Sequence, residues 1–138
     1  MEQSIGESIL ETCVLVVCNE KDLAMTMREA LLSADFSVQV AHNAPDALNR
    51  ITVKKPDLIV LDMMLQRIGG IALLQMLQKS PAAREIPVIL TTARTSPTSR
   101  RDALDAGADA FMSKPFTNED FLSLVHEFLP LQSHHPAS

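Results

Sequence analysis

Short apolar runs alternate along this chain with segments in which apolar residues recur at helical spacing. Three of the runs end in polar residues: Leu58-Ile59-Val60-Leu61 in Asp62, Val88-Ile89-Leu90 in Thr91-Thr92, and Ala110-Phe111-Met112 in Ser113-Lys114-Pro115. A continuous apolar run bounded by turn signals is typical of a strand buried on both faces of a parallel sheet. Two further strands are expected at residues 14–17 and 37–40, and the second alternates as an edge strand does.

Each expected strand is followed by a segment with the 3.6-residue period of a helix. Asn43 and Thr117 are expected to cap the second and the last of these helices. A weaker helix is expected from about Thr98 to Ala106, with Gly107 as its stop. Five strand–helix pairs predict an α/β fold, a doubly wound parallel sheet of five strands with right-handed crossovers.

Composition narrows the class of protein. The chain has 138 residues, of which 46% are apolar, and this is enough for a single domain with one core. Its net charge is −5 and no basic cluster stands out, which argues against nucleic-acid binding. Neither a signal peptide nor a membrane span is evident, so a cytoplasmic location is expected. We expect a domain at residues 12–130 between flexible ends at 1–11 and 131–138.

The polar residues that end the strands predict a reactive site. In parallel sheets, sites form outside the carboxyl ends of the strands, so Asp62, a threonine hydroxyl and Lys114 should meet at one edge. Either Thr91 or Thr92 could supply the hydroxyl. This trio suits a nucleophilic aspartate with two groups that hold a transferred phosphoryl. The simpler reading of Asp62 is a turn residue after a strand.

Four segments in order resemble the receiver domain of bacterial two-component response regulators, over roughly residues 12 to 130. They are Val14-Leu15-Val16-Val17, Pro56-Asp57-Leu58-Ile59-Val60-Leu61-Asp62, Pro87-Val88-Ile89-Leu90-Thr91-Thr92-Ala93 and Gly107-Ala108-Asp109-Ala110-Phe111-Met112-Ser113-Lys114-Pro115-Phe116. The resemblance implies a flavodoxin-like fold with strand order 2-1-3-4-5. It implies that Asp62 is the phosphoacceptor, that Thr92 and Lys114 assist it, and that Thr92 and Phe111 form a switch. It also implies a cis Lys114-Pro115 peptide.

One departure from the family concerns its metal site. The family carries an acidic pair after the first strand, and this chain has Cys18-Asn19 there, followed by Glu20. The resemblance implies weak Mg²⁺ binding by Asp62, Asn19 and the Met64 backbone carbonyl, with Glu20 as a further candidate, because Mg²⁺ prefers hard oxygen ligands.

Each residue of this loop has a simpler structural reading. Asn19 could instead cap the first helix, and Glu20 could lie in its first turn. Cys18 is better read as a small buried hydrophobe than as a redox sensor. Cys13 and Cys18 should point to opposite faces of a strand, which disfavours a disulfide.

The sequence therefore supports two main hypotheses. In the first, the chain is a receiver that takes a phosphoryl group on Asp62 from a histidine kinase or a phosphotransfer protein. An output domain or downstream protein would read the change at the face formed by the fourth and fifth helices and the last strand, which could also form a homodimer. The chain would not be an enzyme beyond self-phosphorylation and autodephosphorylation. In the second, it is a pseudo-receiver, a docking or dimerisation module that works without phosphate. A flavin-binding protein is disfavoured, because the loop at residues 18–22 lacks a phosphate cradle.

Overall fold

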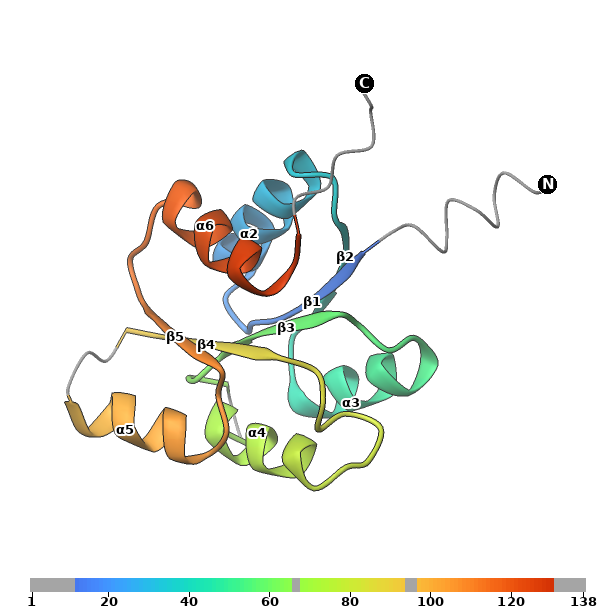
Figure 1. Cartoon of the computed structure of the whole chain (residues 1–138), viewed down its shortest axis with the longest axis vertical. Helices are drawn as coiled ribbons and strands as arrows, with labels where there is room; N and C mark the ends of the chain where they lie inside the picture. Colours follow the sequence, from blue (N-terminus) through green and yellow to red (C-terminus); the bar gives the residue numbers. More distant parts are fainter. Residues whose placement is uncertain (1–11, 66–67, 94–96, 131–138) are drawn as a thin grey trace.

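A five-stranded parallel sheet runs through the middle of the molecule, with helices on both faces (Figure 1). The computed structural model describes residues 12–65, 68–93 and 97–130. Its strands are β1 (Cys13–Val17), β2 (Ser37–Ala41), β3 (Leu58–Asp62), β4 (Val88–Thr92) and β5 (Ala110–Ser113). Its helices are α2 (Lys21–Ser33), α3 (Ala44–Val53), α4 (Gly70–Gln78), α5 (Pro97–Asp105) and α6 (Asn118–Phe128).

The strand order is β2-β1-β3-β4-β5, and every neighbouring pair is parallel. This confirms the flavodoxin-like, doubly wound sheet that was predicted. The expected helix from Thr98 to Ala106 is α5, which runs one residue earlier at each end. The predicted ends at 1–11 and 131–138 lie outside the described residues. No helix in the described part of the chain is long and apolar enough to cross a membrane.

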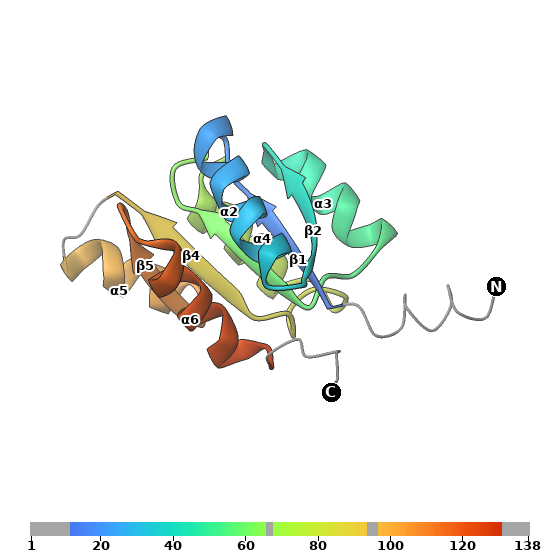
Figure 2. The same ribbon diagram turned by 90° about the horizontal axis from the view of Figure 1, so that it is seen from above.

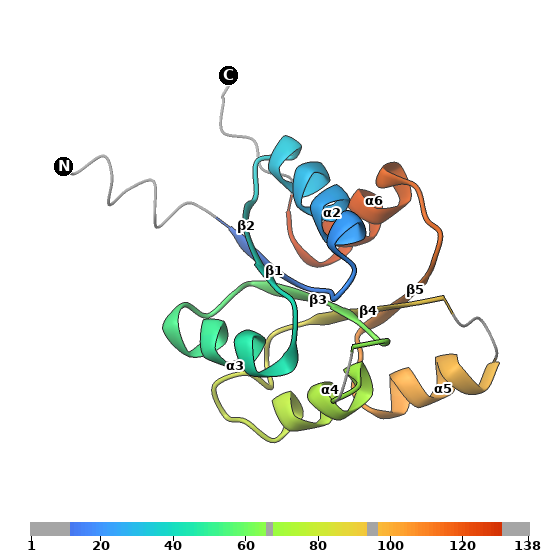
Figure 3. The same cartoon turned by 180° about the vertical axis from the view of Figure 1, so that it is seen from behind.

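The sheet separates two apolar layers. Helices α2 and α6 cover one face, and α3, α4 and α5 cover the other (Figures 1 and 3). Within β3, Val60 belongs to the layer under α2 and α6, whereas Ile59 and Leu61 belong to the opposite layer. Because alternate side chains enter different layers, the inner strands must be apolar throughout, and this is the pattern by which the sequence revealed them. The edge strand β2 is half-buried up to Ala41.

Two aspartates hold the first residues of inner strands. Asp57 Oδ2 accepts a hydrogen bond from the Cys13 backbone N–H at 2.8 Å, and Asp109 Oδ2 accepts one from Val88 N–H at 2.8 Å. Each carboxylate precedes a neighbouring strand and satisfies a donor at the amino-terminal edge of the sheet. These bonds set the start of β1 and β4, and therefore help to set the level at which the strands end.

The helix caps are partly as predicted. Asn43 Oδ1 accepts from Asp46 N–H at 2.8 Å, and Thr117 Oγ1 accepts from Asp120 N–H at 3.0 Å, which confirms both caps. The alternative that Asn19 caps the first helix is wrong. The N-cap of α2 is Glu20, and its side chain makes no capping bond, because its carboxylate is paired elsewhere.

Gly70, the first residue of α4, lies against the carboxyl end of β3. A Cβ atom there would overlap the backbone of Asp62 and Met63, including the Asp62 carbonyl oxygen. The neighbouring Gly69 has room, since the nearest atom to an added Cβ is the Met63 oxygen at 3.9 Å. The backbone of α4 can therefore approach the last residue of β3 only because residue 70 has no side chain.

We expect Gly70→Ala to lower the free energy of unfolding by about 1–3 kcal/mol, the usual cost of forcing a group into a packed site. Alanine favours the helix over glycine by roughly 1 kcal/mol, and the net loss of stability arises because the overlap with the β3 backbone costs more than this gain. Gly69→Ala is the matched control and should change stability by less than about 1 kcal/mol. Urea melts of the three proteins measure this, and equal stabilities would show that α4 can shift away at no cost.

Candidate functional site

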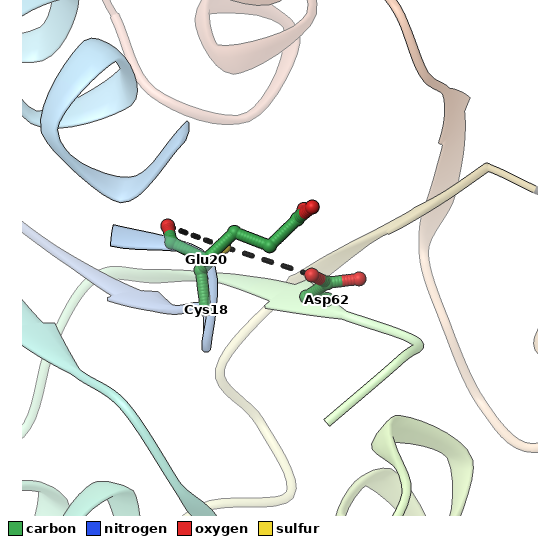
Figure 4. A group of neighbouring side chains, drawn as sticks. All are labelled: Cys18, Glu20 and Asp62. Carbon is green, nitrogen blue, oxygen red and sulfur yellow. Dashed lines mark hydrogen bonds between the residues drawn. The ribbon is translucent and has the colours of Figure 1, made fainter. Parts of the chain in front are cut away.

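The carboxyl ends of β1, β3 and β5 bring charged and polar side chains together at one edge of the sheet. Cys18 follows β1, Asp62 ends β3 and Lys114 follows β5. Figure 4 shows Cys18 and Glu20 on the loop after β1, with the Glu20 carboxylate reaching toward Asp62. The edge at which the strand ends meet is the one that the sequence predicted.

Asp62 is the buried centre of this group, with only 1% of its surface exposed. Its Oδ1 accepts a hydrogen bond from the Met64 backbone N–H at 3.0 Å. Its Oδ2 accepts one from Lys114 Nζ at 3.1 Å. The predicted meeting of Asp62 and Lys114 is therefore confirmed, and the carboxylate is held in one orientation by donors on both oxygens.

Lys114 bridges two carboxylates. Besides Asp62, its Nζ contacts Glu20 Oε1 at 2.9 Å, and the side chain of Glu20 is 61% exposed. Partial burial of Lys114 works to lower its pKa, but the hydrogen bonds to Glu20 and Asp62 and their negative charges together outweigh it. The pKa of Lys114 is raised above its ordinary value, and the side chain is an ammonium group at neutral pH.

Cys18 lies beside this pair rather than only in the core. Its Sγ is 3.6 Å from both Asp62 Oδ2 and the Glu20 carbonyl oxygen. Both of these atoms are acceptors, so the thiol donates its proton to one or the other. The Cys18 residue is fully buried, and this burial, with a smaller contribution from the charge of Asp62, raises its pKa to about 11. The expected burial is confirmed, but the contact between a neutral thiol and the aspartate could not be predicted from the sequence pattern.

The two threonines of β4 have different positions. Thr91 is the register partner of Asp62, and Thr92 follows it as the last residue of the strand, opposite Ser113. Both are fully buried. Among the described atoms, Thr91 Oγ1 finds no hydrogen-bond partner. The structure brings both to the edge that carries Asp62, and the assignment of a role to Thr92 remains a prediction.

Phe111, the expected switch residue, lies in the middle of β5 and is half-buried. It packs on the apolar layer that includes Ala103 of α5 and Leu65 of the loop after β3. The Lys114-Pro115 peptide is cis, as predicted. Phe111 therefore belongs to the apolar layer on the side of the sheet that α3, α4 and α5 cover.

The donor atoms of the site fit a hard divalent cation only in part. Ligand atoms of Cys18, Glu20 and Asp62 lie within 4.8 Å of one another. The two carboxylates are suitable ligands for Mg²⁺, whereas a neutral thiol is not. Lys114 already pairs with both carboxylates and would compete with a cation. Asn19 is half-buried next to this group, and the metal-binding roles of Asn19 and Met64 remain predictions.

Comparison with known proteins gives a consistent result. A family model described as the response regulator receiver domain matches residues 14–126. The response regulator MprA of Mycobacterium avium is 34% identical over 116 residues, which cover 84% of this chain and 50% of that protein. The chain thus spans about half the length of the curated relatives that it matches.

Solved structures are similar in fold. The receiver domain of the Francisella response regulator 1452 matches with a TM-score of 0.79 and 28% identity, over 86% of this chain and 96% of that one. The chemotaxis response regulator CheY4 of Vibrio cholerae matches with a TM-score of 0.81 and 22% identity, over 86% of this chain and 99% of that one. At that identity, the second match shows the fold alone.

Ultraviolet titration of the thiol tests the environment of Cys18. In the Cys13→Ser variant Cys18 is the only thiol, and the chain has no tyrosine whose ionisation would obscure the thiolate absorption. We expect a titration midpoint at about 11 in the folded protein, against 9.0 for an unperturbed thiol. Because the folded state holds this proton more tightly, its stabilisation is complete below pH 9 and is lost as the pH rises toward 11.

The control for this titration is the same variant in denaturant, which should titrate near the ordinary thiol value. A folded midpoint equal to the denatured one would mean that solvent reaches Cys18, in contradiction to its burial beside Asp62. Cys18→Ser should also lose less stability than the Cys18 protein between pH 9 and 11, because its hydroxyl does not ionise in that range.

Proposed function

This chain belongs to the family of response regulator receiver domains, and we propose that Asp62 accepts a phosphoryl group from a histidine kinase or a phosphotransfer protein. The observation that carries the proposal is the buried Asp62 carboxylate with Lys114 Nζ 3.1 Å from one of its oxygens. A carboxylate held at a strand end beside a fixed ammonium is a nucleophile with its electrostatic stabilisation already in place. The chain itself is proposed to work in the cytoplasm, with its donor.

In the proposed reaction an oxygen of Asp62 attacks the phosphorus of a phosphohistidine. The new O–P bond forms as the N–P bond breaks, and the histidine leaves with the electron pair of that bond and takes up a proton. Lys114 then binds a phosphoryl oxygen through one of the three N–H donors of its ammonium group, of which Glu20 and Asp62 take two. Thr92 is proposed to hold another oxygen from the end of β4. The same groups would serve the slow loss of phosphate to water.

A divalent cation such as Mg²⁺, when bound, would offset the negative charge that accumulates around the phosphoryl group. Asp62 and Glu20 are the carboxylates that would hold it, with Asn19 and the Met64 carbonyl as further ligands. Cys18 supports weak binding of Mg²⁺. At this position beside Asp62 it provides a neutral thiol, whereas a carboxylate would add negative charge. Lys114 also holds one oxygen of Glu20, and its positive charge opposes a cation beside that carboxylate.

The signal is proposed to leave through packing. A phosphoryl group on Asp62 would draw Thr92 and Lys114 toward it, and these residues lie at the ends of β4 and β5. Phe111, which lies on β5 and packs against the apolar layer under α3, α4 and α5, would then repack. The face formed by α5, β5 and α6 is proposed as the surface that an output domain, a downstream protein or a second copy reads.

The alternative, a pseudo-receiver that docks without phosphate, draws on Cys18 in place of an acidic residue. The pairing of Asp62 with Lys114 counts against it, because a docking module has no need of a buried carboxylate with its own counterion. Burial of such a pair costs several kcal/mol in desolvation before the attraction is counted, and a site that has lost its function would gain from apolar replacements.

Phosphorylation itself is the first test. We expect a small phosphodonor to add one phosphoryl group to the wild type and none to Asp62→Asn, as measured by intact mass. Asp102→Asn, which removes an exposed carboxylate of α5, should label like the wild type. Labelling of Asp62→Asn to the level of the wild type would place the acceptor elsewhere.

Mg²⁺ affinity tests the metal ligands. We expect Cys18→Asp with Asn19→Asp to bind Mg²⁺ at least tenfold more tightly than the wild type in calorimetry. Each close unit-charge pair contributes roughly 4 kcal/mol before desolvation is counted. Glu20→Gln should weaken the wild-type affinity. If the double variant binds no more tightly and Glu20→Gln abolishes binding, then Glu20 already supplies the charge that the family takes from its acidic pair.

A further inference from the structure

A groove lies at the β2 edge of the sheet, the edge opposite β5. Its charged lining residues are cationic, although the chain as a whole has a net charge of −5. The groove encloses about 380 Å³ and is lined by residues of α2, β2 and α3. Figure 2 shows β2 at the edge of the sheet, between these two helices. Its cationic rim consists of Lys21 and Arg28 from α2 and Arg50 from α3, with His42 at one end. None of the described residues that line it is acidic. We call this surface the β2 groove.

The floor of the β2 groove is the open edge of the sheet. Ser37 N–H donates to the Thr12 carbonyl, and the Ala41 carbonyl accepts from Cys18 N–H, so the backbone groups of these odd-numbered residues face β1. Backbone groups alternate along a strand. Those of Val38 and Val40 therefore point away from β1, toward the side on which no strand of the described residues pairs with β2. Both of these residues line the groove.

The cationic side chains on the two walls of the groove differ in whether they already have polar partners. Lys21 and Arg28 are exposed on α2 and lie seven residues apart, which places them on one face of the helix. On the other wall, Arg50 is already partly engaged, with Nε 3.1 Å from Asp46 Oδ1 and Nη1 3.2 Å from Gln39 Oε1. Neither Lys21 nor Arg28 forms an ion pair with another residue that the structure describes, so the α2 wall carries the stronger unmet positive charge.

We propose that the β2 groove binds an extended acidic peptide segment of a partner protein, which adds a strand to the edge of the sheet. The peptide backbone would pair with Val38 and Val40, and its carboxylates would face Lys21 and Arg28. Strand addition of this kind draws affinity from main-chain hydrogen bonds and specificity from alternate side chains.

Charge selects this occupant over a second copy of the chain. Pairing of β2 with β2 of another copy would bring both sets of Lys21, Arg28 and Arg50 to one seam, and like charges in contact disfavour a partner. An acidic segment instead meets complementary charge on the α2 wall. The inference does not depend on phosphorylation of Asp62, since none of the residues of the groove belongs to that site.

The groove is nevertheless linked to the Asp62 site by one hydrogen bond. His42 Nδ1 is 3.0 Å from the Cys18 carbonyl oxygen, and because a carbonyl only accepts, Nδ1 carries the proton. Cys18 is the residue whose thiol lies against Asp62. A peptide beside His42 would therefore be connected to the Asp62 carboxylate through two residues in contact, His42 and Cys18.

The test uses the full chain labelled with ¹⁵N and a synthetic seven-residue peptide of alternating Glu and Val, capped at both ends. The control peptide replaces each Glu with Lys and keeps the same length and strand propensity. We expect the acidic peptide to bind, to slow hydrogen exchange at the Val38 and Val40 amides, and to bind less tightly as salt is added. The Lys–Val peptide should leave both amides unchanged.

Matched variants locate the charge. Lys21→Glu with Arg28→Glu should weaken binding of the acidic peptide by at least about tenfold. Lys79→Glu with Arg84→Glu changes the net charge equally at exposed positions outside the groove, and should weaken it by no more than about twofold.

Three results would overturn the inference. The first is equal binding of the two peptides or binding of neither, and the second is an equal loss of affinity in the two double variants. The third is slow exchange at Val38 and Val40 before any peptide is added, which would mean that the chain itself or a second copy already covers this edge. The phosphorylation assay of Asp62 is read separately by mass, so that failure of one proposal leaves the other standing.

Discussion

The contact between Asp62 and Lys114 is the constraint on which the rest of this edge depends. A buried carboxylate is tolerated only if a counterion and hydrogen-bond donors replace the water that it has lost. Here the counterion comes from a residue 52 positions later, across the end of β4. The contact between Lys114 and Asp62 forms only if β3, β4 and β5 pair in the correct register and end at matching levels. The positions of Glu20 and Cys18 follow, because both residues contact this pair.

The parts of the structure that depend on local pattern could be predicted. Strands buried on two faces are apolar throughout, so β1, β3 and β4 were visible, and the half-buried β2 showed alternation. Asn43 and Thr117 cap their helices through bonds three residues away, which a sequence displays directly. Asp62 and Lys114 could be placed together because the carboxyl ends of parallel strands share one edge, whatever the intervening loops do.

The parts that depend on competition between partners could not be predicted. Glu20 can cap a helix or pair with Lys114, and only the position of Lys114 in space decides this. The contact of the Cys18 thiol with Asp62 depends on the level at which β1 stops. The cationic residues of the β2 groove, at positions 21, 28 and 50, come from two different helices. Their proximity depends on how these helices pack against β2. The spacing of Lys21 and Arg28 was the one available signal, since seven residues place two side chains on one helical face.

The hydrogen bond between Cys13 and Asp57 has a consequence for the order in which this fold is made. It joins residues 44 apart, and the strand that it anchors lies between β2 and β3 in the sheet. During synthesis β1 can pair with β2 early, but its second edge stays open until β3 has left the ribosome. Pairings between distant segments slow folding, because the chain loses loop entropy before the contact is gained. Assembly of the centre of the sheet therefore waits for the same segment that carries Asp62.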